Sequence, residues 1–290
     1  MPRPMDPSPL ASRVAPLPPR SPDTPLERLR ANLRGLGSRI EAARLRGGHA
    51  APAVTLVAVT KSVPRAALPL LLRAGHAHVG ENRVLPAAAK RESAPRGLVW
   101  HGIGHLQTNK ARKAVSTFDV FHALDSLRLA SELEAVLGAG PADRRWPVYV
   151  QVNAANDPAK GGFRPEETLG ALRTIAALPH LEVVGLMTMA RETDLGEAAR
   201  PCFRALRELR DEAVRVGAVA RADLGLSMGM SSDFEPAVEE GATIVRIGRA
   251  VWDGVGFTPD GGPAGPRAEA PAAPMAPESP TVPPPFPETR

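Results

Sequence analysis

Residues 54–82 read VTLVAVTKSVPRAALPLLLRAGHAHVGEN, and this stretch contains the unit whose repetition decides the fold. It begins with a β-branched, apolar run at Val54–Lys61, continues with a helical pattern at Pro64–Ala74, and ends with a second extended run at Ala77–Asn82. Apolar residues return every three or four positions in the middle segment, which is typical of an amphipathic helix, whereas the flanking runs have the composition of strands. The stretch therefore predicts a parallel β/α/β unit.

The same alternation continues along the chain. Further strands are predicted at Leu98–Gly104, Val120–Asp125, Pro147–Asn153, Glu182–Met189, Asp223–Gly229 and Ile244–Val251, and further helices at Leu127–Leu137, Pro165–Leu178 and Glu197–Val216. One more amphipathic helix, Leu26–Leu45, precedes the first strand. Eight strands that alternate with helices favour an α/β fold of the (β/α)8 TIM barrel type over an open doubly wound sheet. No G-x-G-x-x-G motif follows a strand, which weakens a nucleotide-binding interpretation.

Proline marks the two ends of the chain. Of the 32 prolines in the 290 residues, residues 1–25 contain 9 and residues 258–290 contain 11. Such segments cannot bury enough apolar surface to fold, so we expect two disordered, proline-rich tails. The barrel domain is then predicted to span residues 26–257, which is an ordinary size for this architecture.

Composition excludes several classes of protein. The formal net charge is +5, but the basic residues are spread along the chain without a basic run or interleaved aromatic residues, so we expect no nucleic-acid partner. The single cysteine, Cys202, forbids an internal disulfide and a cysteine-cluster metal site. No apolar run approaches the roughly 20 residues of a membrane span. We therefore expect a soluble, cytoplasmic protein that does not bind membranes.

The predicted strands end in polar residues, and in a barrel of this type the chemistry lies at these carboxyl ends. Lys61 follows the apolar run Leu56–Val59 and is one of only five lysines in the chain. A lysine at this place is either a solvated strand end or, as the neutral amine, a nucleophile that forms a Schiff base with an aldehyde. The neighbouring strand ends favour the second interpretation.

Two glycine-containing turns follow the seventh and eighth strands, at residues 227–231 (SMGMS) and 246–249 (RIGR). This corner of a barrel usually binds phosphate through backbone N–H groups. A lysine beside a phosphate cradle describes pyridoxal phosphate. Arg246 shares a face of its strand with Gly248, so it can reach the pyridine nitrogen, where an arginine disfavours protonation and weakens the ring as an electron sink. The alternative is a barrel arginine paired with an acidic neighbour.

Six sequence motifs along the chain also carry a resemblance to a known family. They are Ala58–Lys61 (AVTK), Gly80–Asn82 (GEN), Trp100–Lys110 (WHGIGHLQTNK), Gly185–Met189 (GLMTM), Leu226–Ser231 (LSMGMS) and Val245–Gly248 (VRIG). In this order, from about Leu29 to Gly254, the chain resembles the pyridoxal phosphate homeostasis protein family, also known as proline synthase co-transcribed homologues.

The resemblance implies a fold-type III barrel, similar to the N-terminal domain of alanine racemase, with pyridoxal 5′-phosphate bound covalently to Lys61. It implies a role in vitamin B6 homeostasis and amino-acid balance without established turnover, with apoenzymes that depend on the cofactor as possible partners. The motif match assigns the cofactor site as follows: Asn82 and His101 line the cofactor; Ser227, Met228, Gly229, Ser231 and Gly248 hold the phosphate; Arg246 faces the ring nitrogen. Arg249 stands where the family has serine or threonine, and it either contacts the phosphate or points away.

Three other interpretations stay open. An amino-acid racemase of the same barrel type needs a second base opposite the lysine, and the only tyrosine, Tyr149, precedes the predicted end of its strand by four residues, which leaves His101. A metal site could include His101, His105 and His122, although no carboxylate or cysteine completes a recognisable spacing, and we expect no metal. The third interpretation is a binding module that holds no cofactor.

For the oligomeric state, we expect a monomer.

Overall fold

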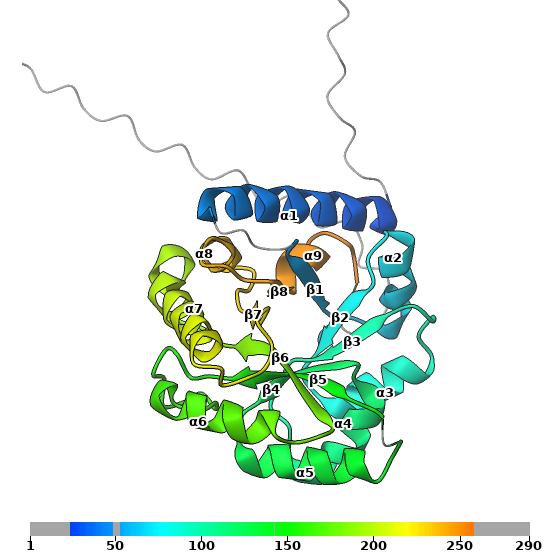
Figure 1. The fold of residues 1–290 in the computed structure, drawn as a ribbon. Coiled ribbons are helices and arrows are strands. Elements are labelled where there is room, and N and C mark those ends of the chain that lie inside the picture. The colour runs from blue at the N-terminus through cyan, green and yellow to red at the C-terminus, as the bar shows by residue number, and fades with distance from the viewer. Residues whose placement is uncertain (1–23, 49–52, 142, 258–290) are drawn as a thin grey trace, which may run out of the picture.

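The computed structural model describes residues 24–48, 53–141 and 143–257. These residues form a closed barrel of parallel strands in chain order, and β1 pairs with both β2 and β8 (Figure 1). The predicted (β/α)8 barrel is confirmed. The predicted tails lie outside the described residues, except for Thr24, which caps the first helix, and Pro25, at which that helix begins one residue earlier than expected.

Each of the eight strands overlaps the segment in which it was predicted. Their bounds are Thr55–Val59 (β1), His78–Glu81 (β2), Val99–Gly102 (β3), Val120–Leu124 (β4), Trp146–Gln151 (β5), Leu181–Met187 (β6), Gly225–Ser227 (β7) and Ile244–Ile247 (β8). Because all eight run in parallel, their carboxyl ends lie at one end of the barrel, which we call the mouth.

Helices connect the strands on the outside of the barrel. They are Pro25–Gly47 (α1), Leu68–Arg73 (α2), Val84–Glu92 (α3), Ala111–Thr117 (α4), Leu127–Gly138 (α5), Pro165–Ala176 (α6), Arg200–Arg215 (α7), Phe234–Glu239 (α8) and Arg249–Trp252 (α9), with 3-10 turns at Arg65–Ala67 (η1), Thr108–Lys110 (η2) and Gly196–Ala199 (η3). Among the described residues, none of these helices has both the length and the apolar character to cross a membrane.

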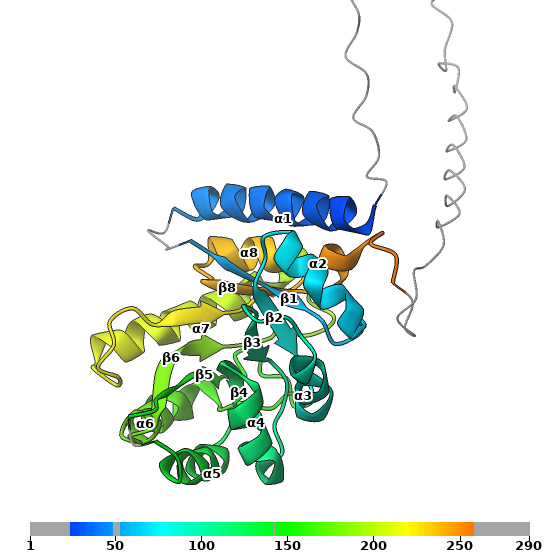
Figure 2. The ribbon, with the colours of Figure 1, turned by 90° about the vertical axis from the view of Figure 1, so that its right-hand side faces the viewer.

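The helix α1 lies outside the β/α repeat and packs against α8 and α9 (Figures 1 and 2). Its start is fixed by a capping box, in which Thr24 and Glu27 bond to each other's backbone N–H groups. Its inner face buries Leu29, Leu36 and Ile40. This packing places α1 beside the elements that carry the β8 turn.

The end of β8 differs from the prediction. The strand was expected to reach Val251, but it ends at Ile247, and Arg249 already begins α9. The reason is local: Gly248 leaves the extended conformation with φ −106° and ψ −78°, and the Trp252 indole then donates a hydrogen bond to the Val59 carbonyl oxygen at 2.9 Å. The chain therefore folds over the end of β1 at the mouth.

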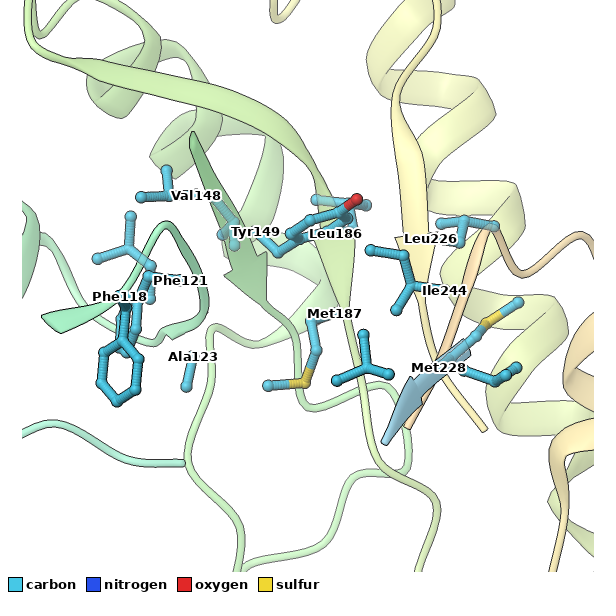
Figure 3. Packing of buried hydrophobic residues seen from close by; sticks show 14 of the residues in the cluster. Phe118, Phe121, Ala123, Val148, Tyr149, Leu186, Met187, Leu226, Met228 and Ile244 are labelled. Carbon is cyan, nitrogen blue, oxygen red and sulfur yellow. The ribbon is translucent and has the colours of Figure 1, made fainter. Parts of the chain in front are cut away.

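The core has one layer between strands and helices and a second layer inside the barrel, and Figure 3 shows some of its residues from close by. Phe121 belongs to the outer layer, where its ring stacks on Trp146 at 5.6 Å. Tyr149 belongs to the inner layer, and two glycines make room for it. A Cβ at Gly185 would lie 2.5 Å from the tyrosine ring, and one at Gly225 would lie 3.0 Å from its hydroxyl.

Candidate functional site

Lys61 lies at the mouth, two residues beyond the end of β1, and its side chain is exposed. The end of β8 packs directly onto this strand end, since a Cβ at Gly248 would lie 3.4 Å from the Cβ of Val59. Within the three described segments, Lys61 makes no hydrogen bond or ion pair. Its amine is therefore available beside the turn that sequence assigned to phosphate.

Three of the other lysines are engaged elsewhere. Lys160 donates to the Ala190 carbonyl oxygen, and Lys113 lies 3.7 Å from Glu92. Lys90 donates to the Thr60 carbonyl oxygen and to Glu81, both at 2.7 Å. The remaining one, Lys110, lines a cavity of about 350 Å³ beside the mouth. Lys61 is thus the lysine that combines a strand end with an uncommitted amine.

The Lys90 contacts form a buried cluster that sequence reasoning missed. Glu81 is 2% exposed, and its Oε1 also accepts a hydrogen bond from the Thr60 hydroxyl at 2.7 Å. The cluster joins α3 to the ends of β1 and β2. Glu81 lies within the Gly80–Asn82 motif, but nothing in the sequence pairs this residue with Lys90, nine residues later.

The turn after β7 depends on a glycine. Gly229 has φ +94°, and a Cβ there would lie 2.7 Å from the Ala237 side chain. The Asp233 carboxylate stabilises the turn by accepting from the Met230 N–H at 2.5 Å, and burial raises the pKa of Asp233. The backbone N–H of Gly229 has no hydrogen-bond acceptor among the residues described.

The backbone N–H groups of Ser231 and Gly248 also have no hydrogen-bond acceptor within the described part of the chain. The β7 and β8 turns are joined, because the Arg246 N–H donates to the Gly229 carbonyl oxygen at 3.0 Å. Met228 is fully buried behind the turn, and Arg249 is exposed at the same corner. The arrangement offers uncommitted N–H donors at the mouth, which is the chemistry that a phosphate requires.

Arg246 lies inside the barrel and is 4% exposed. Its Nη1 donates to the Ser227 hydroxyl at 2.6 Å and its Nη2 to the Thr188 carbonyl oxygen at 2.9 Å. Burial lowers the pKa of Arg246 to about 10. No carboxylate in the described segments forms an ion pair with Arg246, although the charge of Asp233 acts on it and partly opposes the effect of burial on its pKa.

His101 is also inside the barrel, with 3% exposure. Its Nδ1 lies 2.8 Å from His122 Nε2 and its Nε2 lies 3.0 Å from His78 Nδ1. Burial, followed by the charge of His78, lowers the pKa of His101 to about 3. Among the described residues, no group of three His, Cys, Asp or Glu side chains has the arrangement of a metal site.

The structure brings His101, Ser227 and Arg246 into one connected interior, with Lys61 and the N–H groups at its mouth. Asn82 is exposed and lines the same 350 Å³ cavity as Lys110. Ser227 is fully buried, and its hydroxyl is bonded to Arg246 and to His122 Nδ1, the latter at 2.8 Å. The assignments of Asn82 and His101 to the cofactor and of Ser227 to the phosphate stay predictions.

Tyr149, which the sequence already places below the mouth and so argues against as the second base of a racemase, is 7% exposed and stacks on the His122 ring at 4.6 Å. Burial raises its pKa to about 12. A phenol with these properties is held inside the barrel and is a poor proton donor or acceptor for a substrate at the mouth.

Comparisons with known proteins agree with this geometry. The family described as alanine racemase, N-terminal domain, matches residues 26–254. A pyridoxal phosphate homeostasis protein of Aquifex aeolicus is 40% identical over 211 residues, which cover 72% of this chain and 91% of that protein. The human protein of the same name is 34% identical over 232 residues and is covered to 84%.

Among solved structures, PipY of Synechococcus elongatus with PLP bound is 33% identical, with a TM-score of 0.66 over 77% of this chain and 99% of that one. An alanine racemase of Clostridium difficile is 15% identical, with a TM-score of 0.59, and only 55% of that chain is covered. The second likeness concerns the fold alone. On the strength of the matched domain and of these relatives, the chain belongs to the pyridoxal phosphate homeostasis protein family.

Proposed function

We propose that this protein binds pyridoxal 5′-phosphate as a Schiff base on Lys61 and holds and delivers the cofactor inside the cell, as part of vitamin B6 homeostasis and amino-acid balance. The observation that carries the proposal is the uncommitted Lys61 amine at the end of β1, beside the N–H groups of Gly229, Ser231 and Gly248. When bound, the cofactor supplies an aldehyde that reacts with primary amines. The names of the relatives support the same ligand.

The residues of this chain divide the work of binding. Lys61 supplies the nucleophile, and the N–H groups of Gly229, Ser231 and Gly248 are the donors for the phosphate. Arg249 is exposed at this corner and adds a positive charge for the same anion. Arg246, held by Ser227 and Thr188, presents a guanidinium that cannot accept a proton and so disfavours protonation of the ring nitrogen.

We further propose that the protein does not turn over amino acids. A racemase needs a base on each side of the substrate α-carbon, and Tyr149 is buried beneath the mouth with a raised pKa. His101 is bonded through both ring nitrogens to other histidines. The partners of a cytoplasmic, monomeric carrier would be apoenzymes that receive the cofactor.

The test is a spectrum followed by a covalent label. Purified protein should absorb in the near-ultraviolet to violet, borohydride should bleach this band, and mass spectrometry of the reduced protein should place the pyridoxyl group on Lys61. Lys110, which is also uncommitted but lies at the side cavity, is the internal control and should stay unlabelled. A label on Lys110 or Lys160, or the absence of a reducible band, would show that Lys61 at the end of β1 does not form the Schiff base.

A further inference from the structure

A continuous row of hydrogen bonds crosses the interior of the barrel from β2 to β8. It connects His78, His101, His122, Ser227 and Arg246 through contacts of 3.0, 2.8, 2.8 and 2.6 Å. His78 is the first residue of β2, at the end of the barrel opposite the mouth, and is half-buried. The row therefore leads from the end of the barrel opposite the mouth to the Arg246 guanidinium, which the proposed function places at the pyridine nitrogen of the cofactor.

At pH 7 we expect the three imidazoles to be neutral, because burial disfavours the charged form of each. Burial lowers the pKa of His101 to about 3, and burial together with the charges of His101 and Arg246 lowers the pKa of His122 well below its ordinary range. Burial also lowers the pKa of His78. A neutral imidazole has one N–H donor and one acceptor nitrogen, so each ring in a row must point its proton in one direction.

Arg246 decides that direction. A guanidinium only donates, so the Ser227 oxygen accepts from Nη1, and the hydroxyl proton is left for Nδ1 of His122. His122 must then donate from Nε2 to Nδ1 of His101, and His101 from Nε2 to Nδ1 of His78. The opposite direction would leave the buried Ser227 proton without an acceptor in the described segments.

We propose that His122, His101 and His78 are positioning residues that act through Ser227 on Arg246, as a neutral hydrogen-bond chain in which every imidazole carries its proton on Nε2. The chain fixes the rotamer of Ser227 and thereby one of the two contacts that orient the guanidinium. The direction in which the three imidazoles donate their protons is a property of the protein alone. The effect of this direction on cofactor binding rests on the proposed function.

Nitrogen-15 NMR of the protein without cofactor tests the polarity. In a long-range proton–nitrogen correlation spectrum at pH 7, His78, His101 and His122 should each show a protonated Nε2 and an unprotonated Nδ1. His180 is the internal control, because its Nδ1 lies 2.6 Å from a Glu134 carboxylate oxygen and must carry a proton. A protonated Nδ1 on His101 or His122 in the wild-type protein would overturn the proposal.

Two variants test whether Ser227 sets the direction. Ser227→Ala removes the hydroxyl, so the His101 ring, which makes no hydrogen bond to Ser227, should move to nitrogen shifts averaged between its two neutral forms. Ser227→Thr keeps the hydroxyl and should restore the wild-type shifts. Unchanged His180 signals show that each variant is folded. If a folded Ser227→Ala variant retains the wild-type His101 shifts, the hydroxyl does not direct the chain.

Cofactor binding provides the second readout. The dissociation constant for pyridoxal phosphate should rise by about tenfold in Ser227→Ala and return toward the wild-type value in Ser227→Thr, because the Arg246 contact is charge-assisted. Equal constants in all three proteins would refute the action on Arg246. Failure of the wild-type protein to bind the cofactor would refute the proposed function. The NMR result on the direction of the histidine hydrogen bonds would still stand.

Discussion

The ammonium of Lys90 lies 2.7 Å from the carboxylate of Glu81, in an ion pair whose acidic side chain is 2% exposed and whose basic side chain is 15% exposed. The same ammonium donates to the carbonyl oxygen of Thr60, the residue before Lys61. One side chain of α3 thus holds the backbone from which the proposed nucleophile projects. Glu81 Oε1 accepts from both the Lys90 ammonium and the Thr60 hydroxyl, so the buried carboxylate joins the two other side chains of the cluster.

Lys90→Met should lower the free energy of unfolding by about 3–5 kcal/mol, because it leaves the Glu81 carboxylate buried without its counter-ion. Lys113→Met is the matched control. Its ion pair with Glu92 is longer, at 3.7 Å, and exposed, so its loss should cost less than about 1 kcal/mol. Urea denaturation of both variants without cofactor measures the difference, and equal costs would contradict the role given to the buried pair.

Gly229→Ala should weaken binding of pyridoxal phosphate more than binding of pyridoxal. The substitution strains a φ of +94° and drives a Cβ to within 2.7 Å of Ala237, so the N–H groups of the turn must move. Gly217→Ala is the control, since Gly217 also has positive φ but faces open space. Titrations with both ligands measure the effect. Equal wild-type affinities for the two ligands would show that the turn does not bind phosphate.

Stability should fall as the pH falls below about 6.5, partly because of His101. Its pKa is lowered to about 3 in the folded protein, whereas the unfolded imidazole titrates near its ordinary value. Between these two values the unfolded state binds the extra proton, so the folded state loses up to about 1.4 kcal/mol per pH unit for this group.

The variant His101→Gln removes this group and should show a shallower loss of stability between pH 7.5 and 4.5 than the wild-type protein in urea denaturation. His105→Gln makes the same substitution at a histidine whose side chain is 71% exposed and is the comparison variant. A His101→Gln profile that runs parallel to wild type would mean that His101 protonates equally in both states.

The loaded protein should not racemise amino acids. Incubation with L-alanine, L-serine and L-glutamate, followed by chiral chromatography, should give no more D-enantiomer than one equivalent of protein, because Tyr149 is buried beneath the mouth and both ring nitrogens of His101 are bonded to other histidines. Repeated turnovers that disappear in both Lys61→Ala and His101→Ala would instead establish a racemase that uses His101.

The sequence predicts the barrel because its alternation of strands and helices is a local property. Each apolar run, such as Val120–Leu124, identifies a strand without knowledge of its neighbours. The predicted extension of β8 to Val251 failed for the same reason: Ala250 and Val251 are apolar, and only the Trp252 contact with Val59 shows that the chain has turned.

The contacts inside the site could be predicted only in part. Lys61 could be found because a lysine after an apolar strand is visible in the sequence. The link from His122 on β4 to Ser227 on β7 depends on how side chains meet across a closed barrel, which no spacing along the chain encodes. The Lys90 pair likewise depends on how α3 lies against the strands.

The pairing of β1 with β8 means that Lys61 and Gly248, from near opposite ends of the domain, come together only when the ring of strands closes. During synthesis the chain emerges from its amino terminus, so Lys61 leaves the ribosome long before its neighbours on β8 exist. Under the proposed function, capture of the cofactor therefore follows the synthesis and folding of the whole barrel. On the same proposal, a nascent or truncated chain that ends before β8 would expose Lys61 without the N–H groups proposed to hold the phosphate, so only the complete barrel would retain the cofactor.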